Sequence, residues 1–209
     1  AEAVLAVKSV LVDLNDASAT LPNSYNSVEN ITPLETPLSS TINGAALATP
    51  VFLSLYVEND LRLDKYFAET DEKGFRKNKK AGSNNYLCTF RVGEIYLTAA
   101  EAAARLGELS QARTRLLELM RKRYAPEAYE AKSVVVNAMD KEALVQEILD
   151  ERARELAFEG HRWFDLRRST RPRLEKVLDG TRYVLEENDA RYTLAIPKEA
   201  IEANPGLLN

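Results

Sequence analysis

ERARELAFEGHRWFDLRR, residues 151–168, is the stretch from which the rest of the chain can be interpreted. It contains the only tryptophan and the only histidine of the 209 residues, among acidic residues and arginines. Glu151, Glu155 and Glu159 are four residues apart, so a helix would stack them on one face, where like charges repel. Arg152 falls on the apolar face of the same helix. Both features require partners from elsewhere in the chain, which indicates either an ion network that specifies the fold or an active site.

The composition is that of a globular protein. Apolar residues make up 45% of the chain and charged residues 29%, which argues against disorder. The net charge of −4 gives no reason to expect nucleic acid as a partner. The single cysteine, Cys88, cannot form an internal disulfide and has no metal-ligating neighbours. The basic run from Arg76 to Lys80 is interpreted as a solvated loop, and no segment approaches the roughly 20 apolar residues of a membrane helix.

Two helices are predicted between residues 90 and 120. The stretch RVGEIYLTAAEAAARLG places its apolar residues on one face and ends at Gly107, a residue suited to a helix C-cap. A second apolar pattern begins at Leu109, so the tight glycine turn predicts an αα-hairpin. Alanines at positions 99, 103 and 112 allow close packing, in a spacing similar to one tetratricopeptide unit.

Shorter patterns predict the segments on either side. Before this hairpin we expect an amphipathic helix within residues 1–22, loop-like structure over 23–50, a short helix and then an extended segment over 51–67, and an exposed hairpin or loop over 71–85. After it, residues 125–138 with their proline are interpreted as a connection. Asp140 is expected to cap a long helix that ends at Gly160. A second hairpin is predicted around residues 187–189, followed by a short helix or turn from Pro197.

The acidic residues of the opening stretch raise the possibility of a glycosidase. Such enzymes use two carboxylates roughly 5–10 Å apart with unequal pKa values, and residues four apart on a helix satisfy that distance. The neighbouring arginines would hold Glu155 and Glu159 ionised, however, so neither would serve as the neutral acid. His161 has no metal-ligating company and no nucleophile beside it, and is interpreted as a capping or packing residue. Without a phosphate- or dinucleotide-binding motif, the sequence predicts no enzyme, no metal and no cofactor.

The aromatic residues divide into core and loop candidates. Trp163 and Phe164 come directly after the predicted helix end and are expected to pack in the core. Tyr25 and Tyr86 lie in polar loops, where a ring could stack on a ligand. They are the candidate ligand-binding residues.

The opening stretch resembles the signature of the SusD/RagB family, the surface nutrient-binding lipoproteins of Bacteroidetes-type bacteria, whose pattern is E-R-x-x-E-x-x-x-E-G-x-R-W-x-D-L-x-R. The matching residues are Glu151, Arg152, Glu155, Glu159, Gly160, Arg162, Trp163, Asp165, Leu166 and Arg168. Three further stretches match in order, namely LYVENDLRLDKYF with Asp60 and Arg62, FRVGEIYLTAAEAAARLG with Arg91, and LAIPKEAIEANPGLLN at the carboxyl end. The resemblance covers residues 51–209.

The resemblance implies a mainly helical fold, with tetratricopeptide-like hairpins, irregular loops and short β-hairpins. As a single SusD-like domain, residues 1–209 would comprise an N-terminal helix (1–22), a loop-rich excursion (23–89) and a helical scaffold with a C-terminal hairpin (90–209). Family members are typically much longer, so the chain is interpreted as a shortened relative or a fragment that lacks most of the ligand platform. The matched motifs are those of the scaffold, so no ligand-binding residue is carried over.

The resemblance also implies a function and a location. The chain would bind a nutrient, in the family's usual case an oligosaccharide, within an outer-membrane uptake system. Its partner would be a TonB-dependent transporter of the SusC type, over which it sits as a lid. A lipid on a cysteine upstream of Ala1 would anchor it at the cell surface. The alternative is a helical-repeat adaptor for a protein or peptide, which the αα-hairpin around Gly107 favours.

For the opening stretch itself, the hypothesis is a partly buried, hydrogen-bonded ion network. Its members would be Glu151, Arg152, Glu155, Glu159, Arg162 and Asp165. Arg91 and Arg123, on the helical hairpin, are the expected outside partners. Removing one member of a buried network strands its partner, which costs roughly 3–5 kcal/mol.

Overall fold

The structure is a computed structural model that describes residues 1–34, 47–80, 88–178, 180–204 and 206. The fold is mainly helical, as predicted. The chain forms two compact units, residues 1–161 and residues 162–209.

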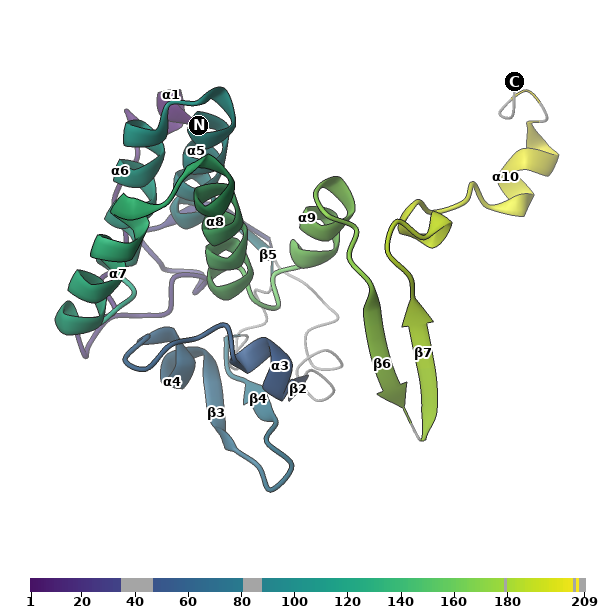
Figure 1. Cartoon of the computed structure of the whole chain (residues 1–209), viewed down its shortest axis with the longest axis horizontal. Helices are drawn as coiled ribbons and strands as arrows, with labels where there is room; N and C mark the ends of the chain where they lie inside the picture. The colour runs from purple at the N-terminus through teal and green to yellow at the C-terminus, as the bar shows by residue number, and fades with distance from the viewer. Residues whose placement is uncertain (35–46, 81–87, 179, 205, 207–209) are drawn as a thin grey trace. The chain divides into compact units, whose positions relative to one another are not determined.

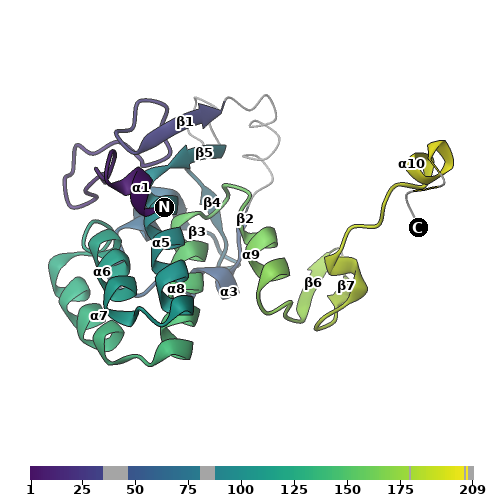
Figure 2. The same ribbon diagram turned by 90° about the horizontal axis from the view of Figure 1, so that it is seen from above.

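Four helices make up the centre of the first unit. They are α5 (Val92–Leu106), α6 (Leu109–Met120), α7 (Pro126–Ala138) and α8 (Lys141–Glu155). Both ribbon views show α5 lying beside α6 and α8 (Figures 1 and 2). Their facing sides form an apolar cluster that includes Leu97, Leu116, Leu119, Leu144 and Ile148. Helix amphipathicity therefore builds the first core.

The predicted αα-hairpin and both predicted caps are confirmed. Gly107 has φ +88° and its N–H reaches the carbonyl oxygens of Ala103 and Ala104, which closes α5. Asp140 precedes α8, and its side chain accepts a hydrogen bond from the Ala143 N–H at 2.9 Å. Local sequence signals thus set where these helices start and stop.

Two helix predictions in this region are wrong. Residues 126–138, interpreted as a connection, form α7, because Pro126 occupies the first helical position, where its missing N–H costs nothing. The long helix expected to reach Gly160 ends at Glu155. The backbone leaves helical geometry beyond it, with φ +60° at Phe158 and φ +86° at Gly160.

The N-terminal helix predicted within residues 1–22 is limited to α1 (Glu2–Leu5). Val7, a residue of the apolar pattern, is 89% exposed. Residues further along bond to distant groups instead of to their own helix. The Val12 N–H donates to Glu29 Oε1 at 2.9 Å, and the Val12 carbonyl accepts from Arg123 at 2.5 Å. Tertiary hydrogen bonds override the helical periodicity here.

Short strands and two small helices complete the first unit. β1 (Asn30–Leu34) pairs antiparallel with β5 (Cys88–Arg91), and a three-stranded sheet has the order β2-β4-β3, from Leu47–Ala48, Arg76–Asn78 and Phe67–Thr70. The small helices are α3 (Pro50–Leu53) and α4 (Arg62–Tyr66). The extended segment predicted through residues 61–66 is therefore helical. The turn and the second strand of the β3–β4 hairpin lie within residues 71–80, in the region 71–85 where an exposed hairpin or loop was predicted, and residues 81–85 lie outside the described residues.

A second apolar cluster lies among these small elements. Phe67 makes edge-to-face ring contacts with Tyr56 at 5.6 Å and with Phe158 at 6.0 Å between centroids. Such contacts add to the apolar area that the rings bury. The first unit thus has two cores, one among the long helices and one beneath α3 and α4.

The second unit contains α9 (Arg162–Arg168), β6 (Leu174–Leu178), β7 (Thr181–Leu185), the 3₁₀ turn η1 (Ala190–Tyr192) and α10 (Lys198–Ala203). The hairpin lies earlier than predicted, between β6 and β7, and Gly180 in its turn has φ +76°. Residues 187–189 lead into η1 instead. Trp163 stacks on Tyr192 at 5.1 Å but is only partly buried and belongs to neither apolar cluster, and Phe164 is 62% exposed, so the prediction that both pack in the core is wrong.

Candidate functional site

The three regularly spaced acids of the opening stretch, Glu151, Glu155 and Glu159, lie in a buried ion network of the first unit. Five cations and five carboxylates take part, with side chains at most 4% exposed: Arg62, Lys80, Arg91, Arg123 and Arg154 with Glu29, Asp60, Glu151, Glu155 and Glu159. The charges of these ten groups balance. Buried charges need such pairing, because water cannot solvate them.

Glu155, near the end of α8, is the centre of the network. One of its oxygens accepts from Arg91 Nη1 at 2.6 Å and the other from Arg62 Nη1 at 3.1 Å. Arg123 Nε approaches both oxygens, at 2.9 and 3.1 Å. Three guanidinium groups therefore share one carboxylate.

A first branch runs from Arg91, at the end of β5, to the loop after α8. Arg91 forms a two-bonded pair with Glu159, with both N···O distances at 2.9 Å, and also reaches Glu29 at 3.1 Å. Lys80 bonds to the Glu159 carboxylate. It also donates to the carbonyl oxygens of Glu155 and Ala157, and these two bonds are both 3.0 Å long. Glu159 is thus not stacked on the helix face with Glu151 and Glu155. The loop after α8 carries it to its two cations.

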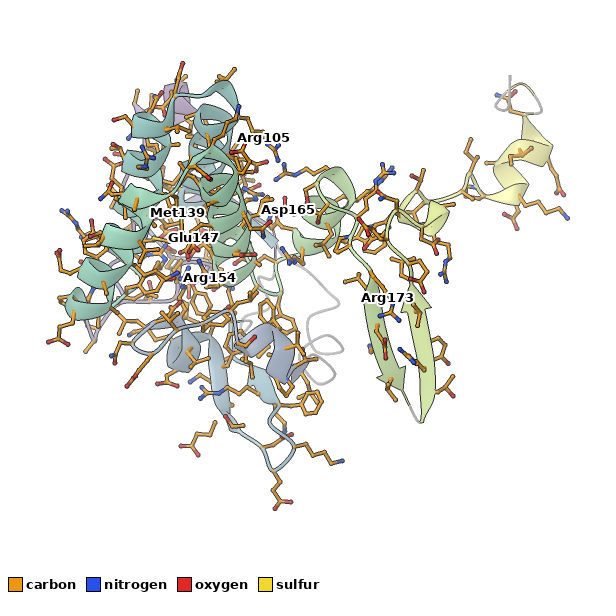
Figure 3. The ribbon with its side chains drawn as sticks, viewed as in Figure 1. Arg105, Met139, Glu147, Arg154, Asp165 and Arg173 are labelled. Atoms are coloured by element: carbon orange, nitrogen blue, oxygen red, sulfur yellow. The ribbon has the colours of Figure 1, made fainter. Side chains whose placement is uncertain are left out.

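A second branch runs along α8 from Glu151. Arg62 Nη1 donates to Glu151 at 2.6 Å, and Arg62 also holds Asp60 through two bonds of 2.8 and 2.9 Å. Arg154 joins Glu151 to Glu147 at 2.7 and 2.6 Å, and Figure 3 shows Glu147 and Arg154 close together on α8. The Arg62 guanidinium lies 5.0 Å from the ring of Tyr124, a residue of the first core. It also lies 6.0 Å from the ring of Tyr56, in the second core. The network therefore joins the two cores.

The network changes the pKa values of its members. Burial alone would raise the pKa of Glu151, but Arg62 and Arg154 outweigh it and lower that pKa to about 2. The same opposition lowers the pKa of Glu155, through Arg123, Arg91 and Arg62, well below its usual range. Burial lowers the pKa of Lys80 to about 8, although Glu159 favours its charged form. The pKa of Glu159 is also lowered, by Arg91 and Lys80 acting against burial. All three carboxylates on and after α8 are therefore ionised at neutral pH.

Gly93, the second residue of α5, leaves the space that the network occupies. A Cβ there would lie 2.6 Å from Arg91 Nη1 and 3.0 Å from Glu155 Oε1. We expect Gly93→Ala to destabilise the protein by about 1–3 kcal/mol, as overpacking does, measured by urea denaturation. At an exposed helical site the same change would stabilise the helix by roughly 1 kcal/mol. A rise in the free energy of unfolding would therefore contradict the close approach of Arg91 and Glu155 to Gly93.

Two buried tyrosines offer a matched test of the hydrogen bonds. Tyr124 donates to Glu151 Oε2 at 3.0 Å, whereas the Tyr66 hydroxyl is buried without a partner among the described residues. We expect Tyr124→Phe to cost about 1.5–3 kcal/mol, the value of a hydrogen bond to a charged group. Tyr66→Phe should change the free energy of unfolding by less than about 0.5 kcal/mol or increase it, because it removes a buried hydroxyl that no described residue bonds to. Equal losses in the two variants would contradict these assignments.

The predicted network residues fall into three groups in the structure: members of the network, a buried residue with other described partners, and residues of the second unit. Arg91 and Arg123 are the partners of Glu155, as predicted. Arg152 is buried, and its described contacts are with residues outside the network, with Nη1 3.3 Å from Thr98 Oγ1 and Nη2 3.9 Å from Glu94. His161 packs against the same Glu94, at 3.6 Å.

The remaining predicted members belong to the second unit. Asp165 pairs with Arg168, three residues along α9, at 2.7 Å, and Arg162 is exposed. The proposed inclusion of Arg162 and Asp165 in the network of α8 is therefore not supported by any described bond.

Five network members escaped the sequence reasoning, namely Glu29, Asp60, Arg62, Lys80 and Arg154. Glu29 and Lys80 lie in segments interpreted as loops, and the basic run ending at Lys80 was expected to be solvated, yet Lys80 is 4% exposed. Asp60 and Arg62 had a signal, since they form the Asp-x-Arg of a recognised stretch. A charged pair beside aromatic and aliphatic residues indicates burial with a partner.

The network geometry does not suit acid–base catalysis. Glu155 and Glu159 are ionised, buried and bonded to guanidinium groups, so neither has a proton to give or a surface that a substrate can reach. Among the described residues no group of three or more His, Cys, Asp or Glu side chains could hold a metal ion. The stretch that dominates the sequence builds the scaffold.

An open groove lies elsewhere in the first unit, with a volume of about 740 Å³. The N-terminal segment forms one side, and α5, α6 and the start of α7 form the other. Its lining includes Val10, Leu11, Tyr96, Leu117, Arg121 and Tyr129. Of the two tyrosines predicted to contact a ligand, Tyr25 is 53% exposed and does not line this groove, and Tyr86 lies outside the described residues.

The comparisons with known proteins identify a family. A family model described as the SusD family matches residues 52–209. No curated protein sequence matches the chain.

Two solved structures resemble the chain along almost its whole length. One is a SusD-like carbohydrate binding protein from Bacteroides vulgatus, with 19% identity and a TM-score of 0.64, covering 99% of this chain and 53% of that one. The other is a SusD superfamily protein from Bacteroides thetaiotaomicron, with 21% identity and a TM-score of 0.67, covering 95% of this chain and 51% of that one. The chain therefore spans about half the length of the structures it matches.

Proposed function

The chain belongs to the SusD family, and from that membership we propose that it is a non-catalytic nutrient-binding component of an outer-membrane uptake system. The observation that carries the proposal is the family match over residues 52–209. The proposed ligand is an oligosaccharide, which the carbohydrate-binding description of a similar structure supports.

The proposed partner is a TonB-dependent transporter of the SusC type, with this protein as its lid. The proposed location is the cell surface, through a lipid anchor on the outer membrane. Within the described residues no helix has both the length and the apolar character needed to cross a membrane.

The chemistry of the first unit supports binding in preference to catalysis. Its densest group of ionisable side chains is sealed from solvent and internally neutralised, so it can position elements but cannot transfer protons to a ligand. A binding protein needs rigid support for its surfaces, and a network that joins two cores provides it.

A glycan array followed by calorimetry tests the ligand class. We expect the protein to bind at least one oligosaccharide with a Kd of about 1 mM or below. If the two loop tyrosines contact it, Tyr25→Ala or Tyr86→Ala should weaken binding by about tenfold, through loss of ring contact. Tyr183→Ala, an equally exposed tyrosine of β7, is the matched control. Absence of binding to every saccharide would overturn the proposed ligand.

A pull-down from native outer membrane tests the partner separately. We expect a TonB-dependent transporter to be recovered with the protein. Recovery of the protein without any such transporter would contradict the uptake role, whatever the glycan array shows.

A further inference from the structure

Along one side of the groove beside α6, the main chain is held in place at two points, and between them its N–H and C=O groups have no hydrogen-bond partner among the described residues. The Ser9 carbonyl accepts from the Tyr96 hydroxyl at 3.1 Å, and Val12 is held by Glu29 and Arg123. Between these two anchors, neither the N–H nor the C=O of Val10 and Leu11 has a hydrogen-bond partner in the described part of the chain. Immobilised main-chain groups that border a groove are ready to pair with another extended chain.

Apolar side chains accompany these open groups. Val10 is 59% exposed, and Leu11 and Leu117 are partly buried against the first core. A ligand in the groove would thus meet aliphatic surface next to free main-chain donors and acceptors. That combination matches a polypeptide segment, whose own main chain supplies the complementary groups.

Arg121 supplies the charge in the groove. Its Nη2 donates to the Tyr129 hydroxyl at 3.3 Å, and its guanidinium lies 5.2 Å from the Tyr129 ring centre. The other ionised residues of the lining are paired, Glu118 with Arg115 at 2.9 Å and Lys122 with Asp13 at 2.8 Å. Arg121 forms no ion pair with any described residue. Its cation is exposed, held in place by a neutral ring, and free to bind a carboxylate.

From these features we propose that the groove is a docking site for an extended, acidic polypeptide segment of a partner protein. The segment pairs its main chain with Val10 and Leu11, places apolar side chains against Leu117, and bonds a carboxylate to Arg121. This site is additional to the proposed oligosaccharide function, and it favours the adaptor alternative that the helical hairpin raised from the sequence. Either proposal can fail without the other.

Two labelled peptides test the site by fluorescence anisotropy on the full chain. One is a blocked octapeptide of alternating valine and glutamate, and the other has glutamine in place of glutamate. We expect the acidic peptide to bind at least about tenfold more tightly, because a charge-assisted bond is gained. Its affinity should fall as salt is added, because Arg121 is exposed.

Matched variants locate the binding. Arg121→Gln should remove the difference between the peptides while leaving the melting temperature unchanged, because Arg121 is exposed and forms no ion pair with the residues that the structure describes. Arg182→Gln, at an arginine of β7 that is also exposed but is paired with Glu175, should preserve the difference. Val10→Pro should weaken both peptides because it removes a main-chain donor, whereas Val10→Thr keeps that donor and should bind normally.

Three outcomes would overturn the proposal. These are no binding of the acidic peptide, equal binding of the two peptides, or a difference that persists in Arg121→Gln. An acidic oligosaccharide such as oligogalacturonate serves as the comparison ligand. If it bound through Arg121 and the peptide did not, the groove would be a site for acidic saccharides and the polypeptide assignment would be wrong.

Discussion

Replacing Glu155 with glutamine should lower the free energy of unfolding by about 3–5 kcal/mol, the cost of leaving buried charges without their counter-charge. The substitution preserves the shape of the side chain but removes the charge that Arg62, Arg91 and Arg123 share. All three arginines are 0% exposed, so solvent cannot take over the role of the carboxylate. Urea denaturation at pH 7, followed by far-UV circular dichroism, measures the effect, since α5 to α8 provide most of the helix.

Glu142→Gln is the matched control for this substitution. Glu142 lies in the first turn of the same helix but is exposed, so its loss should cost well under about 1 kcal/mol. If Glu155→Gln were as stable as Glu142→Gln, the three arginines would not depend on the Glu155 charge, and the network would not stabilise the fold.

Acid should destabilise the protein steeply below about pH 4.5. The pKa of Glu151 is lowered from 4.5 to about 2 in the folded state by Arg62 and Arg154 acting against burial, and the pKa values of Glu155 and Glu159 are lowered too. Glu151 alone corresponds to a contribution on the order of 3 kcal/mol at neutral pH. Because the folded pKa is below the unfolded one, this contribution is complete above about pH 4.5 and disappears as the pH falls towards 2.

Urea denaturation at a series of pH values between 7 and 3 measures this loss. We expect a plateau from pH 7 to about 5, a fall below it, and a shallower fall in Glu151→Gln, which lacks one of the titrating groups. Lys80 adds a second rise of stability with pH, in the alkaline range. Its folded pKa of about 8 is below the ordinary 10.5, so its charged form opposes folding at neutral pH and this cost is relieved as the pH rises from 8 to 10.5. A stability that is flat down to pH 3 would contradict the ion pairing of the three carboxylates.

The helical scaffold was predictable because its signals are local. Apolar residues at helical spacing, the glycine at position 107 and the cap at Asp140 act within one or two turns of the chain, and each is found where it was predicted. The identity of two network partners was also predictable. A buried acidic residue requires cations, and the predicted partners Arg91 and Arg123 directly flank the two helices of the hairpin.

The remaining partners could not be read from spacing, because the chain reaches them only by folding back. Lys80 meets Glu159 across 79 residues and Arg62 meets Glu155 across 93. Nothing within a few residues of Lys80 distinguishes a solvated lysine from a buried one. Its burial depends on where the loop after α8 places the Glu159 carboxylate.

By itself, then, the sequence determined the helices of residues 92–120 and 141–155, the family, and the need for a buried ion network around Glu155. Only the tertiary structure decided that residues 8–14 leave their helical pattern to bond with Glu29 and Arg123, and that the resulting segment borders a groove with Arg121. The physical reason is the range of the interactions. Helix periodicity and caps are satisfied by neighbours in the chain, whereas buried charges and open main-chain groups are satisfied by whichever distant segment the fold brings to them.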